Sequence, residues 1–373
     1  MALRTKVFSV AIEVTAQCQH KCAHCYNAWR NNNSAIPESA SKLHARVEKL
    51  LASIDVDHLT ITGGEPFVRS DLFDLLDRVK AKGVGIQIIS NGSLIDDAIA
   101  TRLAPYGVSY VQVALEGPTA LLHDAQVGGV SGGKSPFDST LRGIVALRRA
   151  GIPVMGCIVV TKKNATRIAE ILAVFASLGV RHIALSRFSP AGYAVRHVAE
   201  LLPSRDDLLV AFRQAIPFAS TSRDKMRITC TMPVPPCAVE VEDLAPIRFG
   251  TCAIGTPMQE FALGPDGRLR HCTLHGSALG GAKDILEPDV DVAAIVTGSE
   301  VKDYKRVLPE FCIGCSHALS CNGGCGAAST WVLGSRKFPD PLVWQHVDDV
   351  FFAKLESQRS ELQSASAVVA SAL

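Results

Sequence analysis

Apolar and polar residues along the first half of the chain alternate between short apolar runs and longer amphipathic segments. The short runs are typical of strands buried in a parallel sheet, and the amphipathic segments are typical of helices that cover such a sheet. The expected strands are residues 7–14, 58–62, 85–90, 110–115, 154–160 and 182–187. The expected helices are residues 40–53, 71–82, 95–103, 137–149 and 166–178. Six strand–helix repeats predict an α/β fold with a parallel sheet, and the spacing alone leaves full and partial barrel closure open.

The helix ends carry further local signals. Glycine follows four helical runs, as is common for the left-handed residue at a helix end: Gly83, Gly107, Gly151 and Gly179. One more helix is expected over residues 202–218, with Ser204 as its N-cap and the acidic Asp206 and Asp207 in its first turn. After it the strand–helix repeat stops.

The pattern divides the chain into four parts. We expect the strand–helix core over residues 1–200, a helix and proline-rich linker over 201–250, a small cysteine-rich α+β domain over 251–350 and a tail over 351–373. Within the third part, residues 261–272 predict a hairpin whose turn is Pro-Asp-Gly. The elements there are short, so metal binding is expected to supply part of the folding energy.

The near-neutral composition removes several classes of function. The chain has 373 residues with 38 basic against 36 acidic side chains, which gives no case for nucleic acid or an anionic membrane as a partner. No apolar stretch reaches the ~18 residues that a membrane helix needs, and the N-terminus does not resemble a signal peptide. We therefore expect a soluble cytoplasmic protein whose twelve cysteines serve metal binding or catalysis.

The first three cysteines form one group. Cys18, Cys22 and Cys25 follow the first expected strand, at the carboxyl edge of the sheet where α/β proteins bind ligands. Three thiolates on a four-iron cluster would leave one iron open for an exogenous ligand. His20 and His24 in the same loop are expected to pack or to face solvent rather than to bind iron.

This spacing, with Tyr26 directly after it, resembles the motif of the radical S-adenosylmethionine (SAM) superfamily. The resemblance continues at later strand ends, first with a Gly-Gly-Glu-Pro sequence whose backbone contacts the SAM amino group in that family. The residues that it implies for SAM binding are Tyr26, Gly63, Gly64, Glu65, Pro66, Ser90, Asn91, Glu116 and Arg187. Many relatives carry Asp at the position of Glu116, and Arg187 is a candidate for the SAM carboxylate or ribose. His123 and Asp124, followed by glycines, match a loop common in these enzymes.

The resemblance implies a fold, two cofactors and a reaction. The fold is a partial (β/α)6 TIM-like barrel, and the cofactors are SAM and a [4Fe-4S] cluster on Cys18, Cys22 and Cys25. Reduction of the cluster would cleave SAM to a 5′-deoxyadenosyl radical, which abstracts a hydrogen atom from a substrate C–H. The protein would hold that C–H close and exclude water.

The later cysteines resemble the SPASM extension of the same superfamily, which typically carries seven cysteines and binds auxiliary iron–sulfur clusters. Six of the seven are present: Cys252, Cys272, Cys312, Cys315, Cys321 and Cys325. No cysteine follows Cys325, and Met258 stands where a partner of Cys252 is often found. The resemblance implies one or two auxiliary [4Fe-4S] clusters, the first on Cys252, Cys272 and Cys325 and the second on the other three cysteines.

The fourth ligands of these clusters are left open by the sequence. Cys237 or Cys230 is a candidate for the first cluster, and Asp340 or His346 for the second. An open iron in either cluster would bind a substrate heteroatom or pass an electron. Read without the resemblance, the last four cysteines also suit one structural zinc ion.

Three thiols lie outside the matched motifs. Cys157, in the fifth expected strand, is expected to be a small buried apolar residue. Cys230 and Cys237 lie in the linker, and either is a candidate hydrogen-atom donor to a substrate radical if the reaction is an epimerisation.

The function implied is radical modification of a ribosomally made peptide, by crosslinking, epimerisation or oxidation, in natural-product biosynthesis. The alternatives are a radical dehydrogenase or epimerase of a small molecule such as an aminocyclitol or sugar, and a non-enzymatic zinc-stabilised binding protein. The first expected strand begins near the N-terminus without a fused leader-binding domain, so either a separate leader-binding protein or a small substrate is expected. A flavodoxin- or ferredoxin-type electron donor is the further partner implied.

Overall fold

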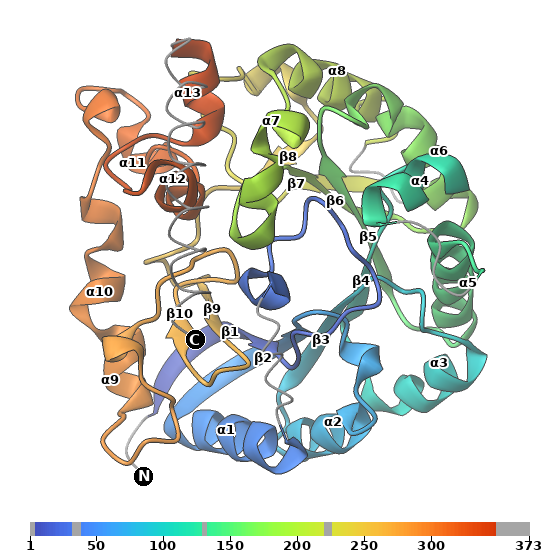
Figure 1. The fold of residues 1–373 in the computed structure, drawn as a ribbon, viewed down its shortest axis with the longest axis vertical. Helices are drawn as coiled ribbons and strands as arrows, with labels where there is room; N and C mark the ends of the chain where they lie inside the picture. The colour runs from blue at the N-terminus through green and yellow to red at the C-terminus, as the bar shows by residue number, and fades with distance from the viewer. Residues whose placement is uncertain (1–3, 32–38, 129–132, 220–225, 348–373) are drawn as a thin grey trace, which may run out of the picture.

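Within the described residues, a curved sheet of ten strands forms the centre of the molecule (Figure 1). The computed structural model describes residues 4–31, 39–128, 133–219 and 226–347. The strands are β1 (Thr5–Glu13), β2 (Ile54–Thr62), β3 (Gly85–Ser90), β4 (Tyr110–Ala114), β5 (Val154–Val160), β6 (His182–Arg187), β7 (Arg227–Cys230), β8 (Arg248–Phe249), β9 (Glu260–Leu263) and β10 (Leu269–Arg270). Their order is β10-β9-β1-β2-β3-β4-β5-β6-β7-β8, and all neighbours are parallel except β9 and β10. Over the described residues β8 and β10 are edge strands, so the sheet is an open, partial barrel.

The repeat predicted from the sequence is confirmed for β1 to β6. The helices of this part are α1 (Ala40–Ser53), α2 (Leu72–Ala81), α3 (Asp97–Leu103), α4 (Ala120–Val127), α5 (Pro136–Arg149), α6 (Ile168–Ser177), α7 (Val198–Leu201) and α8 (Arg205–Ala215). Figure 1 shows α1, α2, α3, α5 and α6 on the outside of the curved sheet. The four glycines expected at helix ends have φ angles from 62° to 73°, and Ser204 caps α8 in a capping box with Asp207.

Successive side chains of each strand face alternately the helix layer and the inside of the curved sheet. In β5, Gly156 faces the helix layer, because a Cβ added there would lie 2.8 Å from the ring of Phe175 in α6. Met155, Cys157 and Val159 therefore face the inside. A side chain placed near the carboxyl end of a strand on this inner face is positioned to meet a ligand.

The segment predicted as a proline-rich linker contributes two strands to the sheet. β7 pairs with β6, and β8 pairs with β7. These strands have four and two residues, too few for a periodic pattern to be recognised. The prediction of a linker or extended connection did not include these two strands.

The predicted hairpin is confirmed as β9 and β10, with Pro265, Asp266 and Gly267 in its turn. β9 also pairs in parallel with β1, which joins the cysteine-rich part of the chain to the main sheet. One apolar core cluster contains residues from Val7 to Val343. The division at residues 200, 250 and 350 remains a prediction, and the tail, residues 351–373, lies outside the described residues.

The later elements are short. The helices are α9 (Val292–Thr297), α10 (Ser299–Lys302), α11 (Ala318–Cys321), α12 (Gly326–Leu333) and α13 (Pro341–Val347). Turns of 3-10 helix are η1 (Ala28–Asn31), η2 (Pro66–Val68), η3 (Ala104–Tyr106), η4 (Ala165–Arg167), η5 (Gly192–His197), η6 (Glu242–Leu244), η7 (Gly280–Ala282), η8 (Tyr304–Arg306) and η9 (Glu310–Cys312). Among the described residues, no helix combines the length and the apolar character needed to span a membrane.

Candidate active site

Residues 18–25, which we call the cysteine loop, follow β1 at the carboxyl edge of the sheet. Two backbone hydrogen bonds join the loop to the end of α4, from Lys21 N to Val127 O (2.8 Å) and from Ala23 N to Gln126 O (3.3 Å). The segment of His123 and Asp124, expected to be a loop, is thus part of a helix that supports the cysteine loop.

The segment after β6 holds the other side of the cysteine loop. Ala194 N donates to Cys25 O at 2.9 Å. Gly192 has a φ angle of +56°, and a Cβ added to it would lie 2.1 Å from Tyr26 O. Glycine alone allows two backbones to come this close in that conformation. The position of the cysteine loop therefore depends on both α4 and η5.

The three thiols of the cysteine loop lie near one another. Burial raises the pKa of Cys22, and the neighbouring Cys25 and Cys18 raise it further. Adjacent thiolates repel, so a cationic metal centre among them would be stabilised. Across the described residues, no group of three or more Cys, His, Asp or Glu side chains is placed to hold a single metal ion. Three neighbouring thiols in one short loop suit an iron–sulfur cluster, in which each thiolate binds a different iron.

Gly64 brings the end of β2 against the chain that leads into the cysteine loop. Gly64 N donates to Thr15 O at 2.6 Å, and Glu65 N donates to Gln17 O at 2.8 Å. A Cβ added to Gly64 would lie 2.0 Å from Gln17 O. The Gly-Gly-Glu-Pro segment is therefore in direct backbone contact with this chain.

Glu65 joins the ends of β2 and β3. Its buried carboxylate accepts hydrogen bonds from Ser90 Oγ (2.8 Å), Asn91 N (2.8 Å) and Phe67 N (3.2 Å). Burial raises the pKa of Glu65 to about 7, although the three donors act to lower it. The Glu65 side chain thus orients the loops after β2 and β3, which the resemblance predicts to bind SAM. Its own carboxylate oxygens accept hydrogen bonds from the protein.

Asn91 connects β3 to the cysteine loop. Its Oδ1 accepts hydrogen bonds from Gln19 Nε2 and Ser93 N, each at 3.0 Å. Its Nδ2 lies 3.7 Å from Cys18 Sγ and donates toward it. An N–H directed at a thiolate stabilises the negative charge. The structure therefore brings Asn91 to the first cysteine of the group.

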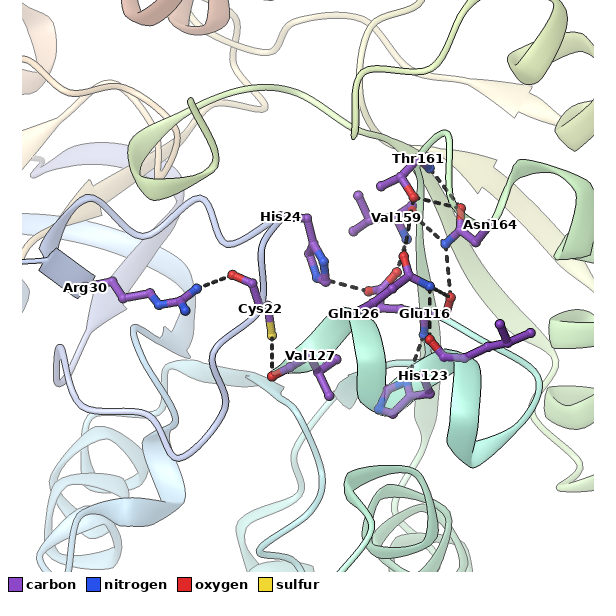
Figure 2. Close-up of polar contacts among 11 residues, drawn as sticks. Cys22, His24, Arg30, Glu116, His123, Gln126, Val127, Val159, Thr161 and Asn164 are labelled. Carbon is purple, nitrogen blue, oxygen red and sulfur yellow. Dashed lines mark hydrogen bonds and ion pairs between the residues drawn. The ribbon is translucent and has the colours of Figure 1, made fainter. Parts of the chain in front are cut away.

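Glu116 is the centre of a buried polar network after β4 (Figure 2). Its Oε2 accepts a hydrogen bond from Val159 N at 3.1 Å, and its Oε1 lies 3.4 Å from His24 Nε2. Its backbone N donates to His123 Nδ1 at 3.0 Å, and its carbonyl accepts from Asn164 Nδ2 at 3.2 Å. Burial raises the pKa of Glu116 to about 8 and lowers that of His24 to about 4. Near neutral pH both groups are therefore largely uncharged.

The two histidines of the cysteine loop pack against the protein rather than face solvent. His20 Nε2 lies 3.2 Å from Ser93 Oγ, and His24 points at Glu116 (Figure 2). The expectation that they pack in the loop is confirmed, and the solvent-facing alternative is wrong.

Several residues of this region were missed by the sequence analysis. Gln126 and Asn164 donate to the Glu116 carbonyl, and Arg30 donates to the carbonyl of Cys22 (Figure 2). The Arg30 guanidinium also lies over the ring of Tyr193, 3.9 Å from its centroid. Single polar residues with tertiary partners leave no periodic or spacing signal, so a sequence pattern has no means of finding them.

Arg187, the predicted contact of the SAM carboxylate or ribose, has protein partners. Its side chain is buried at the end of β6, Nε donates to Pro233 O at 2.6 Å, and Nη2 donates to Asp340. A buried guanidinium requires a carboxylate partner, and Asp340 supplies it. A contact of Arg187 with SAM would have to form beside these protein partners, and it remains a prediction. Tyr26, which directly follows Cys25 and is also predicted to bind SAM, has its Oη 3.4 Å from Thr62 Oγ1 at the end of β2.

A second group of thiols contains Cys252, Cys272 and Cys325. Burial and, after it, the nearby Cys325 and Cys252 raise the pKa of Cys272 to about 12. Burial and the same three cysteines also raise the pKa of Tyr304, whose buried Oη has no hydrogen-bond partner among the described residues. Met258, whose side chain is 57% exposed, does not replace the absent cysteine partner.

A third group of thiols lines a cavity of about 300 Å³. It contains Cys312, Cys315 and Cys321, and Cys237 lines the same cavity. Cys237, a candidate ligand of the first auxiliary cluster, thus lies in one lining with the three cysteines predicted for the second. Cys325 is not part of this lining and lies near Cys272 of the second group of thiols.

Asp340 is not free to serve as the fourth ligand of this third group. Its Oδ2 accepts from Cys325 N at 2.7 Å, its Oδ1 accepts from Leu342 N at 2.9 Å, and it pairs with Arg187. The side chain of His346, the other candidate, lies outside the described residues.

The remaining two cysteines are buried. Cys157 is 8% exposed on the inner face of β5, which confirms the expectation of burial. Cys230 is fully buried at the end of β7 and donates to Met232 O at 3.4 Å. Its role as a hydrogen-atom donor remains a prediction.

The chain is similar in sequence to one protein superfamily and to several known proteins. Residues 12–174 match the model of the radical SAM superfamily. PqqA peptide cyclase of Gluconobacter oxydans is 24% identical over 351 residues, which cover 92% of each chain. Mycofactocin maturase MftC of Mycobacterium tuberculosis is 31% identical over 198 residues, which cover 52% of this chain and 48% of that protein.

Among solved structures, SuiB of Streptococcus suis bound to the precursor peptide SuiA superposes with a TM-score of 0.67 at 16% identity. The superposition covers 90% of this chain and 75% of SuiB. At this identity the likeness establishes the fold, a mixed α/β molecule built on a parallel sheet.

Proposed function

We propose, on the premise that this chain belongs to the radical SAM superfamily, that it modifies a ribosomally made precursor peptide at a C–H bond. Enzymes of this family use a [4Fe-4S] cluster and SAM, which together supply a 5′-deoxyadenosyl radical that abstracts a hydrogen atom. The chain is an enzyme of this kind, so the non-enzymatic zinc-binding alternative is set aside. Crosslinking, epimerisation and oxidation are the three candidate outcomes.

One observation carries the choice of a peptide substrate. The similarity to PqqA peptide cyclase extends over 92% of both chains and therefore includes the cysteine-rich part beyond residue 174. A match over most of the chain does not by itself select a peptide, because AdoMet-dependent heme synthase of Oleidesulfovibrio alaskensis is also 25% identical over 89% of this chain. The full-length similarity to PqqA peptide cyclase, together with the fold shared with SuiB bound to its precursor peptide, supports a peptide substrate.

In this proposal the residues around the cysteine loop have separate tasks. Cys18, Cys22 and Cys25 hold the cluster, and Asn91 directs an N–H at Cys18. The backbone from Gly63 to Pro66, which contacts the chain leading into the cysteine loop, is the segment assigned to SAM. The inner face of the sheet, behind the loop, holds the substrate and keeps water away from the reacting C–H.

We further infer two auxiliary [4Fe-4S] clusters, one on Cys252, Cys272 and Cys325 and one at the cavity lined by the third group of thiols. The electrons that start the reaction come from a flavodoxin- or ferredoxin-type donor. A separate protein that binds the leader of the precursor peptide is the expected second partner, and docking of the leader along an exposed strand edge is one way to bind it.

The test is an anaerobic reaction with a candidate precursor peptide, chosen from any short reading frame found beside the gene for this chain. Reductant, SAM and this peptide should yield 5′-deoxyadenosine and a peptide whose mass has fallen by two hydrogens for a crosslink or oxidation. An epimerised peptide keeps its mass in water and gains one mass unit in deuterated water. A triple variant, Cys18→Ala, Cys22→Ala and Cys25→Ala, should give neither product.

The small-molecule alternative predicts a different result in the same assay. 5′-Deoxyadenosine release would rise with an aminocyclitol or sugar and stay at its basal level with the peptide. That outcome would remove peptide maturation as the function and leave the radical SAM chemistry in place.

A further inference from the structure

Four thiols, rather than three, line the cavity of about 300 Å³. Cys312, Cys315 and Cys321 come from η9, from the chain after it and from α11, and Cys237 comes from the segment between β7 and β8. We propose that Cys237 is the fourth thiolate ligand of the second auxiliary cluster and takes the place of the missing seventh cysteine. This inference rests on the proposed function, since it requires that the chain loads auxiliary iron–sulfur clusters.

The backbone around Cys237 is held in place independently of any metal. Pro235 O accepts hydrogen bonds from Ala238 N (2.9 Å) and Val239 N (3.1 Å), which closes a turn around Cys237. Pro235 also packs against Gly324, since a Cβ added to Gly324 would lie 2.9 Å from Pro235 Cγ. The turn that presents Cys237 therefore contacts the loop between Cys321 and Cys325 directly.

A buried ion pair fixes the same two segments at a second point. Arg187 donates to Pro233 O at 2.6 Å and to the carboxylate of Asp340. Asp340 N in turn donates to Gly323 O at 2.8 Å. The segment that carries Cys237 and the loop that carries the later cysteines are thus both tied to Arg187. This arrangement positions the thiol before a cluster is bound, as a ligand site requires.

The charges around the cavity favour a metal centre. The four thiols line one cavity, and the Cys312 thiol lies against the loop that leads to Cys325, since a Cβ added to Gly323 would lie 3.6 Å from Cys312 Sγ. Glu240 and Glu242 also line the cavity, whereas no lysine or arginine of the described chain does. Four thiolates without a protein cation beside them are stabilised by iron.

Other candidates for the fourth position are less well placed. Cys325 belongs to the second group of thiols, with Cys272 and Cys252. The carboxylate oxygens of Asp340 already accept from two backbone N–H groups and pair with Arg187. His317 lines the cavity too, so its exposed side chain is the competitor that an experiment must separate from Cys237.

The experiment uses the full chain in which Cys18, Cys22 and Cys25 are replaced by Ala, so that only auxiliary clusters load and activity plays no part. Iron and sulfide are added anaerobically, and iron, zinc and sulfide per chain are measured with the EPR spectrum after mild oxidation. The parent should carry about eight irons, as expected for two four-iron clusters. Cys237→Ala should lose between about one and four irons. A loss of one iron should appear as the EPR signal of a three-iron cluster that the parent lacks.

Three further variants make the result decisive. Cys237→Ser, which keeps an oxygen donor in place, should retain more iron than Cys237→Ala. Cys230→Ala removes the other unmatched linker thiol and should leave iron content and the EPR spectrum unchanged. His317→Ala should also match the parent. Unchanged far-UV circular dichroism, with about four irons left in the first auxiliary cluster, shows that Cys237→Ala has folded.

Several results would overturn the inference. Cys237→Ala could keep all its iron and show no new EPR signal, or His317→Ala could produce the loss instead. One zinc ion per chain that depends on Cys237 would replace the cluster by a structural metal site. Failure of peptide modification in the unmutated enzyme, with the Cys237-dependent iron intact, would count against the proposed function alone.

Discussion

Arg187 and Asp340 form an ion pair in which neither side chain is exposed to solvent, and the pair links the end of β6 to the start of α13. Asp340 also accepts a hydrogen bond from Cys325 N at 2.7 Å, and Arg187 donates to Pro233 O at 2.6 Å. The end of β6, the segment at Pro233 and the cysteine-rich part at Cys325 and Asp340 therefore meet at this ion pair. The resemblance predicts a SAM contact for Arg187, and its contacts in the structure also place it at the junction between the sheet and the cysteine-rich part.

Replacement of Arg187 by Met should destabilise the protein, because it leaves the Asp340 carboxylate buried without its cation. Loss of one partner from a buried pair costs about 3–5 kcal/mol, so the unfolding temperature should fall clearly. The control is Arg167→Met, which breaks a pair with Glu170 whose side chains are 51% and 50% exposed, and its cost should be about 0–1 kcal/mol. If Arg187→Met unfolds at the same temperature as the unmutated protein but no longer binds SAM, the main role of Arg187 is to bind SAM.

Replacement of Gly64 by Ala should displace the cysteine loop. The added Cβ would lie 2.0 Å from Gln17 O and 2.9 Å from Ala16 O, and backbone atoms cannot move aside as a flexible side chain can. We expect loss of about four irons per chain and of 5′-deoxyadenosine formation, while the auxiliary clusters remain. Gly83→Ala is the control for iron content, because no atom lies within 4 Å of its added Cβ and the cost of its φ of +71° falls on the end of α2, outside the cysteine loop. Normal iron content in Gly64→Ala would show that the loop tolerates this shift.

The sequence predicted the strand–helix repeat well because each strand is a buried apolar run and most helices bury one apolar stripe. α4 escaped prediction because it buries His123, Asp124 and Gln126 beside Val127, so its buried face is polar and carries no amphipathic signal. β8 escaped because two residues are too few to show a period.

Sequence spacing was enough to group some of the cysteines, whereas others are grouped only by tertiary contacts. Cys18, Cys22 and Cys25 are neighbours in sequence, so their spacing was enough to group them. Cys237 joins its group only through the turn at Pro235 and the contact of that turn with Gly324, and neither leaves a spacing motif. The sequence could name Cys237 as a surplus thiol, but not the group to which it belongs.

Glu65 should make stability depend on pH. Its folded pKa of about 7 lies above its ordinary value of 4.5, so the folded state binds the proton more tightly than the unfolded state. The resulting stability is complete below pH 4.5 and is lost as the pH rises through 7. The loss is on the order of 3 kcal/mol, from 1.36 kcal/mol per pKa unit. Glu65→Gln should remove this part of the pH dependence, whereas Glu170→Gln, on an exposed helix face, should not. Unfolding midpoints in denaturant at pH 5 and pH 8 measure it, and parallel curves for Glu65→Gln and the unmutated chain would contradict it.

Tyr304 should tune the first auxiliary cluster without holding it. Its phenol is buried beside Cys252, Cys272 and Cys325, and its Oη lacks a hydrogen-bond partner among the described residues. A hydrogen bond to a cluster sulfur stabilises the reduced, more negative state and so raises the reduction potential. Tyr304→Phe should therefore shift the potential of one cluster to a more negative value at unchanged iron content, as measured by an EPR-monitored redox titration. Tyr106→Phe, at an exposed hydroxyl bonded to Asp77, is the control and should leave all potentials unchanged. Loss of iron in Tyr304→Phe would instead identify the phenol oxygen as a ligand, and unchanged potentials would exclude contact with the cluster.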